Sequence, residues 1–144
     1  MENSYSPVPE NEVKSRIDDL RSIITKTDID GVLLLSTVET FYYSGIGLDG
    51  AVFIPKEEEP THLVKRNIDL ARNFSAIKTI KKFGRLSNIF STLNIDNHSK
   101  IALELDILPY SYVKYLESKT NDINISDGSD FLRNKRAIKS RFEI

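Results

Sequence analysis

Apolar positions near the start of the chain follow a helical period and then give way to a continuous apolar run. A stripe with offsets of 4, 3 and 4 predicts an amphipathic helix that ends near Thr27. Its members are Val13, Ile17, Leu20 and Ile24. The apolar run at 32–35, Val-Leu-Leu-Leu, is typical of a strand that is covered on both faces. The pattern therefore predicts a helix followed by a central, buried strand.

The later apolar segments alternate between β-prone runs and helical stripes. Runs at 51–55 and 61–65 flank the charged loop 56–60, and this arrangement suits an antiparallel hairpin. Further strands are predicted at 77–81, 100–105 and 123–126, and helices at 67–74, at 86–93, from Pro109, and from Ser129 to about Ile138. The alternation predicts a layered α/β domain with a mixed sheet.

A short helix with three aromatic residues is predicted directly after the central strand. Ser36 and Glu39 fit a capping box, in which the serine accepts from a backbone amide and the glutamate reaches back. Phe41, Tyr42 and Tyr43 cannot all face inward on one short helix, so at least one should lie near the surface. Packing in the core is the commoner use of such residues. An exposed tyrosine beside the glycine-containing loop 44–50 would suit a domain that leans over a partner's pocket or an oligomer interface.

Composition limits the classes of function. A chain of 144 residues is about one domain, and 20 basic against 21 acidic side chains leave no basic excess for nucleic acid. No apolar window is long enough to span a membrane, and residues 1–9 are polar where a signal peptide needs an apolar stretch. The absence of cysteine removes disulfides and thiolate sites. These features favour a soluble, cytoplasmic protein that binds neither nucleic acid nor membrane.

Few residues carry a pattern of catalysis or of ligand binding. His62 and His98 have no partner at metal-ligand spacing, and both are interpreted as structural or surface residues. The loop 44–50 matches neither phosphate-binding glycine pattern and contains no basic residue, so its glycines are interpreted as a sharp turn. Glu104 and Asp106 would point to one face of a strand and could seat a cation or an acid-base pair, although solvated strand-end acids are the favoured interpretation.

The chain ends in a basic segment. A solvated helix face is its simplest interpretation, and contact with another domain is the functional one. The basic residues are Arg133, Lys135, Arg136, Lys139 and Arg141.

Three blocks of sequence resemble the N-terminal domain of the prolidase, aminopeptidase P and creatinase family. The first is 30–36, Asp-Gly-Val-Leu-Leu-Leu-Ser, followed by 42–45, Tyr-Tyr-Ser-Gly, which is similar to the family's strand, short helix and Tyr-x-(Thr/Ser)-Gly turn. The second is 100–104, Lys-Ile-Ala-Leu-Glu, with Leu-Pro at 108–109. The third joins Phe-Leu at 131–132 to Arg-Ala-Ile-Lys-Ser at 136–140 and Glu-Ile at 143–144, and it looks like the family's interdomain link. The resemblance covers the chain from about Glu12 to Ile144.

The resemblance implies a three-layer α/β/α fold, related to ribonuclease H, around a mixed, mainly parallel sheet of about five or six strands. It assigns 12–132 to the N-terminal domain and 133–144 to the start of a linker, after a flexible lead-in at 1–11 that the prolines and polar residues there indicate. It also implies that two divalent metal ions (Mn, Co or Zn) are bound by a C-terminal catalytic domain that this sequence lacks. No catalytic residue, metal ligand or cofactor is therefore expected in this chain.

In relatives, the N-terminal domain helps to form a homodimer and limits the active site to short Xaa-Pro peptides. The candidates for this gating or dimer contact are Thr37, Glu39, Phe41, Tyr42 and Tyr43, and the candidates for contact with the chain's own catalytic domain are Arg136, Lys139 and Glu143. Two alternatives stay open, a stand-alone binding or scaffold module and the N-terminal domain of a creatinase-type amidinohydrolase. The second rests only on the Tyr-Tyr-Ser-Gly match.

Overall fold

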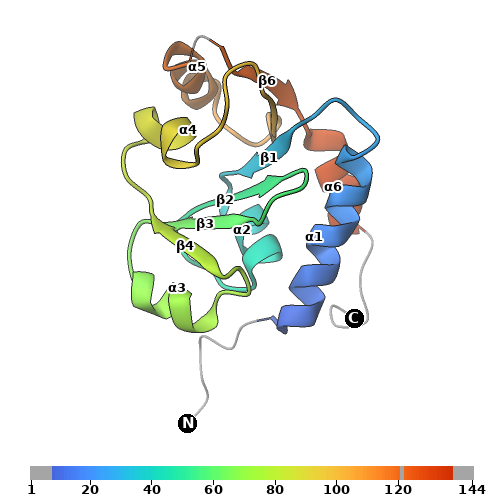
Figure 1. The fold of residues 1–144 in the computed structure, drawn as a ribbon, viewed down its shortest axis with the longest axis vertical. Helices are drawn as coiled ribbons and strands as arrows, with labels where there is room; N and C mark the ends of the chain where they lie inside the picture. Colours follow the sequence, from blue (N-terminus) through green and yellow to red (C-terminus); the bar gives the residue numbers. More distant parts are fainter. Residues whose placement is uncertain (1–7, 121, 138–144) are drawn as a thin grey trace.

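The computed structural model describes residues 8–120 and 122–137 (Figure 1). Helices and strands alternate along these residues, as the apolar pattern predicts. In chain order they are α1 Glu10–Ile24, β1 Gly31–Leu34, α2 Thr37–Ser44, β2 Gly50–Pro55, β3 Thr61–Val64, α3 Ile68–Phe74, β4 Thr79–Lys82, the 3-10 turn η1 Leu86–Asn88, α4 Ile89–Thr92, β5 Lys100–Leu103, α5 Tyr110–Ser118, β6 Asn124–Asp127 and α6 Ser129–Ala137.

Within the described residues, six strands form one mixed sheet in the order β4-β3-β2-β1-β5-β6. β2 pairs antiparallel with β3, as the predicted hairpin requires, and it also pairs antiparallel with β1. The other three pairings are parallel, so every strand except β2 runs in the same direction. The carboxyl ends of these five strands therefore lie at the same end of the sheet, where ligands of α/β domains commonly bind.

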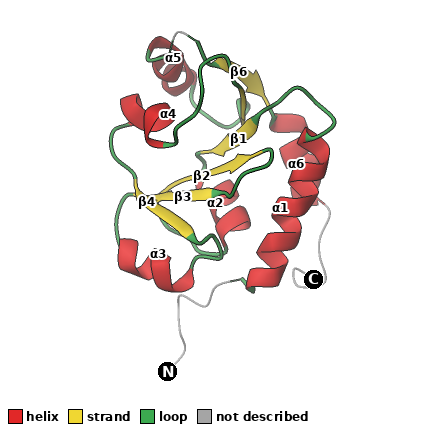
Figure 2. Cartoon of the chain, in the orientation of Figure 1, coloured by secondary structure: helices red, strands yellow, loops and turns green. Residues whose placement is uncertain are grey.

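Helices cover both faces of the sheet, which confirms the three-layer arrangement (Figure 2). Successive side chains of β1 point to opposite layers, because strand residues alternate between the two faces. Val32 and Leu34 pack into the layer of α1, α2 and α6, whereas Leu33 packs into the layer of α4 and α5. All four residues of β1 are buried, as expected for a central strand. Near the β4 edge, α3 packs into a smaller cluster with β3.

The ends of α2 follow the local chemistry of the sequence. The Ser36 side chain accepts a hydrogen bond from the backbone N–H of Glu39 at 3.3 Å, which confirms the serine half of the predicted capping box. Gly45 follows the helix in the left-handed conformation, with φ of 83°, and its N–H donates to the carbonyl oxygen of Phe41. A non-glycine residue would be strained at this position, and its Cβ would lie about 3.1 Å from a methyl group of Val13.

Several elements differ from their predicted bounds, among them the helix at 86–93, the strand at 77–81 and the closing helix. The predicted helix 86–93 is divided into η1 and α4, which together form a short, irregular segment. The predicted strand at 77–81 starts later, at Thr79, because the Ser75 side chain accepts the backbone N–H of Ile77 at 3.2 Å and holds a turn there. Ser129 is the first residue of α6 rather than its cap, and the Asp127 side chain accepts the N–H of Ser129 at 2.9 Å.

Candidate functional site

The aromatic helix α2 lies at the carboxyl end of β1, and its predicted site residues have very different exposures. Thr37 is exposed, and Phe41 exposes 44% of its surface. Glu39 and Tyr43 are fully buried, and Tyr42 is half-buried. The prediction that at least one aromatic residue reaches the surface is confirmed. The most exposed of the three is Phe41, rather than the tyrosine that was considered for an interface.

A small apolar surface surrounds Phe41. Val38, one turn earlier on α2, exposes 55% of its surface. Gly47 is exposed, and a Cβ built on it would lie 4.0 Å from Cδ1 of Phe41. We call the group Thr37, Val38, Phe41 and Gly47 the α2 surface. Val38 was not among the site residues predicted from the sequence, although its spacing of three from Phe41 places both residues on one helix face.

Contacts from α1 hold this surface in place. The Arg16 guanidinium donates from Nη1 to the carbonyl oxygen of Tyr42 at 2.8 Å, and its Cζ lies 4.1 Å from the centre of the Tyr42 ring. Arg16 also pairs with Glu12 through Nε at 3.2 Å. Tyr42 and Tyr43 meet edge to face, with ring centres 4.9 Å apart. The half-buried tyrosine is therefore covered by an arginine that is itself only 6% exposed.

The chain before α1 also contacts the end of α2. Val8 is buried, and its N–H donates to the carbonyl oxygen of Gly45 at 3.0 Å. The Ser44 hydroxyl donates to the carbonyl oxygen of Thr40 at 2.5 Å. Hydrogen bonds of the buried residues Val8 and Ser44 therefore fix the end of α2 beneath the exposed α2 surface.

The two histidines differ in their surroundings: His62 is buried and His98 is exposed. His62 is fully buried on β3, and its Nδ1 lies 3.0 Å from the Ser75 hydroxyl. Burial lowers the pKa of His62 to about 4, because the charged ring would lose its hydration. His98 is exposed in a turn with φ of 69°. Among residues 8–120 and 122–137, no group of three or more His, Cys, Asp or Glu side chains could hold a metal ion.

Glu104 and Asp106 do not lie on a strand, because β5 ends at Leu103. Glu104 is buried, whereas Asp106 is exposed and pairs with Arg133 of α6 at 2.6 Å. The Ser129 hydroxyl accepts the backbone N–H of Asp106 at 3.0 Å. The prediction that these two acids share a strand face is therefore wrong, and Asp106 joins the β5–α5 turn to α6.

The predicted interdomain residues fall at the end of the chain. Arg136 is part of α6, but its side chain lies outside the described part of the structure. Lys139 and Glu143 also lie outside the described residues. Their role stays a prediction.

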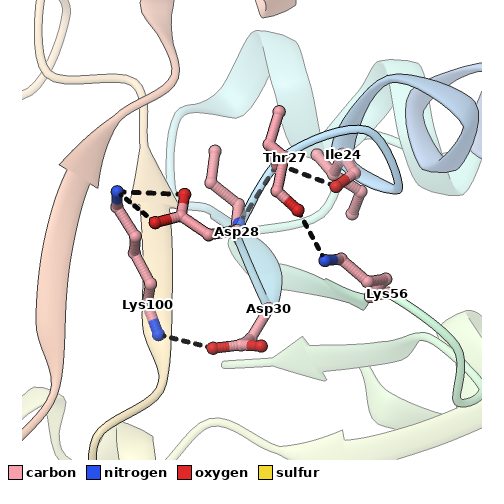
Figure 3. A network of polar contacts seen from close by, with 7 residues as sticks. Ile24, Thr27, Asp28, Asp30, Lys56 and Lys100 are labelled. Carbon is pink, nitrogen blue, oxygen red and sulfur yellow. Dashed lines mark hydrogen bonds and ion pairs between the residues drawn. The ribbon is translucent and has the colours of Figure 1, made fainter.

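A polar cluster lies at the other end of the sheet from α2, where β1 and β5 begin (Figure 3). The Lys100 side chain donates to both carboxylate oxygens of Asp28 at 3.1 Å, and its backbone N–H donates to Asp30 at 2.8 Å. The Lys56 side chain donates to the carbonyl oxygen of Thr27 at 2.9 Å. The hydrogen bond and charge of Lys100 hold the pKa of Asp28 below its ordinary value. This cluster joins the starts of β1 and β5 to the end of β2, which is a structural role.

Comparison with known proteins identifies the family. Residues 16–138 match the sequence model of the Creatinase/Prolidase N-terminal domain. The chain belongs to this family. An Xaa-Pro dipeptidase of Pyrococcus horikoshii is 24% identical over 134 residues, which are 92% of this chain and 37% of that protein. The chain thus spans little more than a third of the length of this relative.

Solved structures of the Creatinase/Prolidase N-terminal domain have the same fold. An Xaa-Pro dipeptidase from Bacillus anthracis superposes with a TM-score of 0.73 at 22% identity, covering 91% of this chain and 38% of that one. The N-terminal domain of a putative metallopeptidase from Corynebacterium diphtheriae superposes with a TM-score of 0.69 at 18% identity, covering 81% and 95% of the two chains. Among the described residues, none of the helices has the length and apolar character to cross a bilayer.

Proposed function

We propose that this chain is the non-catalytic N-terminal domain of a proline-specific peptidase. The observation that carries this proposal is the family match over residues 16–138, together with a relative named Xaa-Pro dipeptidase of which the chain spans only 37%. Two divalent metal ions and the catalytic groups then belong to a C-terminal domain that this sequence does not include. The substrates of the full-length protein are short peptides of the Xaa-Pro type.

In the full-length homodimer, the α2 surface contacts the partner subunit and narrows its active site. The exposure of Phe41 and Val38 supports this role, because exposed apolar patches often mark interaction sites and aromatic residues are enriched at protein interfaces. The hydrogen bonds from Arg16 to the Tyr42 carbonyl group and from Val8 to the Gly45 carbonyl group support it as well, because a rigid support fixes the position of an exposed side chain.

A comparison of two proteins tests the assignment to the peptidase class. The 144-residue chain and the product of the whole open reading frame are each assayed for Xaa-Pro dipeptide hydrolysis with added manganese or cobalt. We expect hydrolysis by the longer protein alone. Hydrolysis of creatine with no cleavage of the dipeptide would instead place the protein on the creatinase branch, and a lack of both activities would favour a binding module.

Substitution of Phe41 tests the gating role. In the full-length protein, we expect Phe41→Ala to lower kcat/KM for the dipeptide about tenfold, equivalent to about 1.4 kcal/mol, because a truncated interface aromatic loses its packing. Tyr110→Ala on α5 is the matched control, since Tyr110 is 76% exposed in the other layer. Equal effects of the two substitutions, or no effect of the first, would contradict the gating role.

A further inference from the structure

Positive charge is concentrated in one segment of the chain. Residues 65–85 contain seven Lys or Arg and one Asp, although the whole chain has a net charge of −1. The rest of the chain contains 13 basic and 20 acidic residues. The segment runs from the end of β3 through α3 and β4, so it occupies one edge of the sheet.

Four of these cations gather at the carboxyl ends of β3 and β4. The strands are parallel, and Val64 is the register partner of Lys82, so the residues that follow them are neighbours. We call Lys65, Arg66, Lys82 and Arg85 the basic corner; all four are exposed.

Within the described residues, the basic corner has no neutralising carboxylate. Arg72 and Lys78, which lie nearby in sequence, pair with Asp69 at 3.7 Å and with Glu10 at 2.9 Å. No carboxylate of the described residues lies within ion-pair distance of the four corner cations. Lys65 instead lies over the ring of Phe83, at 5.0 Å from its centre. The corner therefore presents uncompensated positive charge.

β4 also presents an unpaired backbone edge. Within residues 8–120 and 122–137 it pairs with β3 alone. The N–H of Phe83 donates to the carbonyl oxygen of Val64 at 2.9 Å, so the backbone groups of Phe83 and Lys81 point toward β3. Successive residues of a strand direct their N–H and C=O groups to opposite sides. The N–H and C=O groups of Ile80 and Lys82 therefore point away from β3, toward the open edge. An extended chain could form a ladder with them.

We propose that the β4 edge and the basic corner bind an extended acidic peptide segment of a partner protein, which adds to the sheet as a further strand. Its backbone pairs with Ile80 and Lys82, and its carboxylates lie against the corner cations. Pairing of two β4 edges from two copies is disfavoured, because Lys81 and Lys82 would lie close to the same lysines of the second copy. Nucleic acid fits less well, because it has no peptide backbone that could pair with β4. Its phosphates would also be repelled by the rest of the chain, which carries a net negative charge.

Nuclear magnetic resonance of the 15N-labelled 144-residue chain tests the proposal. The probe is a synthetic peptide, Glu-Val-Glu-Thr-Glu-Val-Glu, and its counterpart with lysine in place of glutamate is the charge control. We expect the acidic peptide to shift the amide signals of Ile80 and Lys82, and the lysine peptide to leave them unchanged. A peptide with the same acidic side chains and N-methylated backbone amides should bind at least about tenfold more weakly, because it cannot form the ladder.

Charge reversal at the corner provides the second measurement. We expect the double variant Lys82→Glu with Arg85→Glu to weaken binding of the acidic peptide at least about tenfold. The matched control is Lys14→Glu with Lys26→Glu, which changes the net charge equally at exposed sites before β1. Equal weakening by both pairs would overturn the proposal, as would undiminished binding of the N-methylated peptide or tighter binding of a short DNA duplex.

Discussion

His62 is a titratable side chain buried against a hydroxyl group rather than against a charge. It lies on β3 beside Ser75, fully buried, and burial lowers its pKa from 6.5 to about 4. Between these two pH values the unfolded chain binds a proton on this residue that the folded chain does not. The free energy of unfolding is therefore highest above about pH 6.5 and falls as the pH drops toward 4, with a total loss of about 3 kcal/mol from this residue.

Replacement of His62 by asparagine tests this linkage. His62→Asn keeps a polar atom near Ser75 and does not titrate, so we expect its unfolding free energy to fall less between about pH 7.5 and about pH 4.5 than that of the native chain. Urea unfolding at several pH values measures the difference. His98→Asn is the matched control, because His98 is exposed and asparagine tolerates its positive φ. An unchanged pH dependence in His62→Asn would show that other groups cause the acid sensitivity.

At the scale of elements, α1 positions α2 through one nearly buried arginine. Arg16 combines a hydrogen bond to the Tyr42 carbonyl, a cation–π contact with the Tyr42 ring and an ion pair with Glu12. We expect Arg16→Met to lower the unfolding free energy by about 3 kcal/mol, because it removes a charged donor from the half-buried Tyr42 carbonyl group and the stacked cation from the ring. We expect Lys14→Met, at an exposed position of the same helix, to change it by less than about 0.5 kcal/mol.

The order of effects among Arg16 variants separates charge from geometry. Arg16→Lys keeps the charge but loses the planar guanidinium, so its unfolding free energy should lie between those of the native chain and Arg16→Met. The measurement is urea unfolding monitored by tyrosine fluorescence. Equal stability of the lysine variant and the native chain would mean that charge alone, rather than stacking on Tyr42, joins the two helices.

The sequence predicts the type and order of the elements because their apolar periods are clear. The buried run at 31–34, the hairpin and the cap of α2 need only local patterns and are all present. Which aromatic residue of α2 is exposed depends on Arg16, which comes from 26 residues earlier in the chain, and no local pattern contains that information. The place where β4 starts depends instead on a local turn at Ser75, which the apolar period does not show. The basic corner was missed because its residues gather only when β3 and β4 pair.

For the whole molecule, one sheet separates two apolar layers, and the central strand β1 contributes to both. Leu33 packs into the layer of α4 and α5, and Leu34 into the layer of α1, α2 and α6. Both side chains are fully buried, so we expect Leu33→Ala and Leu34→Ala each to cost about 2–5 kcal/mol of unfolding free energy. Because both layers share β1, each substitution should lower the stability of the whole domain in a single transition.

Hydrogen exchange of backbone amides distinguishes this outcome from independent layers. In either variant, we expect protection to fall by the same free energy in α1 and in α5, although each variant removes packing from only one of these layers. The matched comparison is Val38→Ala, an exposed apolar residue whose truncation should leave protection in both helices within about 0.5 kcal/mol of the native chain. If Leu33→Ala lowered protection in α5 and left α1 unchanged, the two layers would unfold separately, and β1 would join two units rather than belong to one.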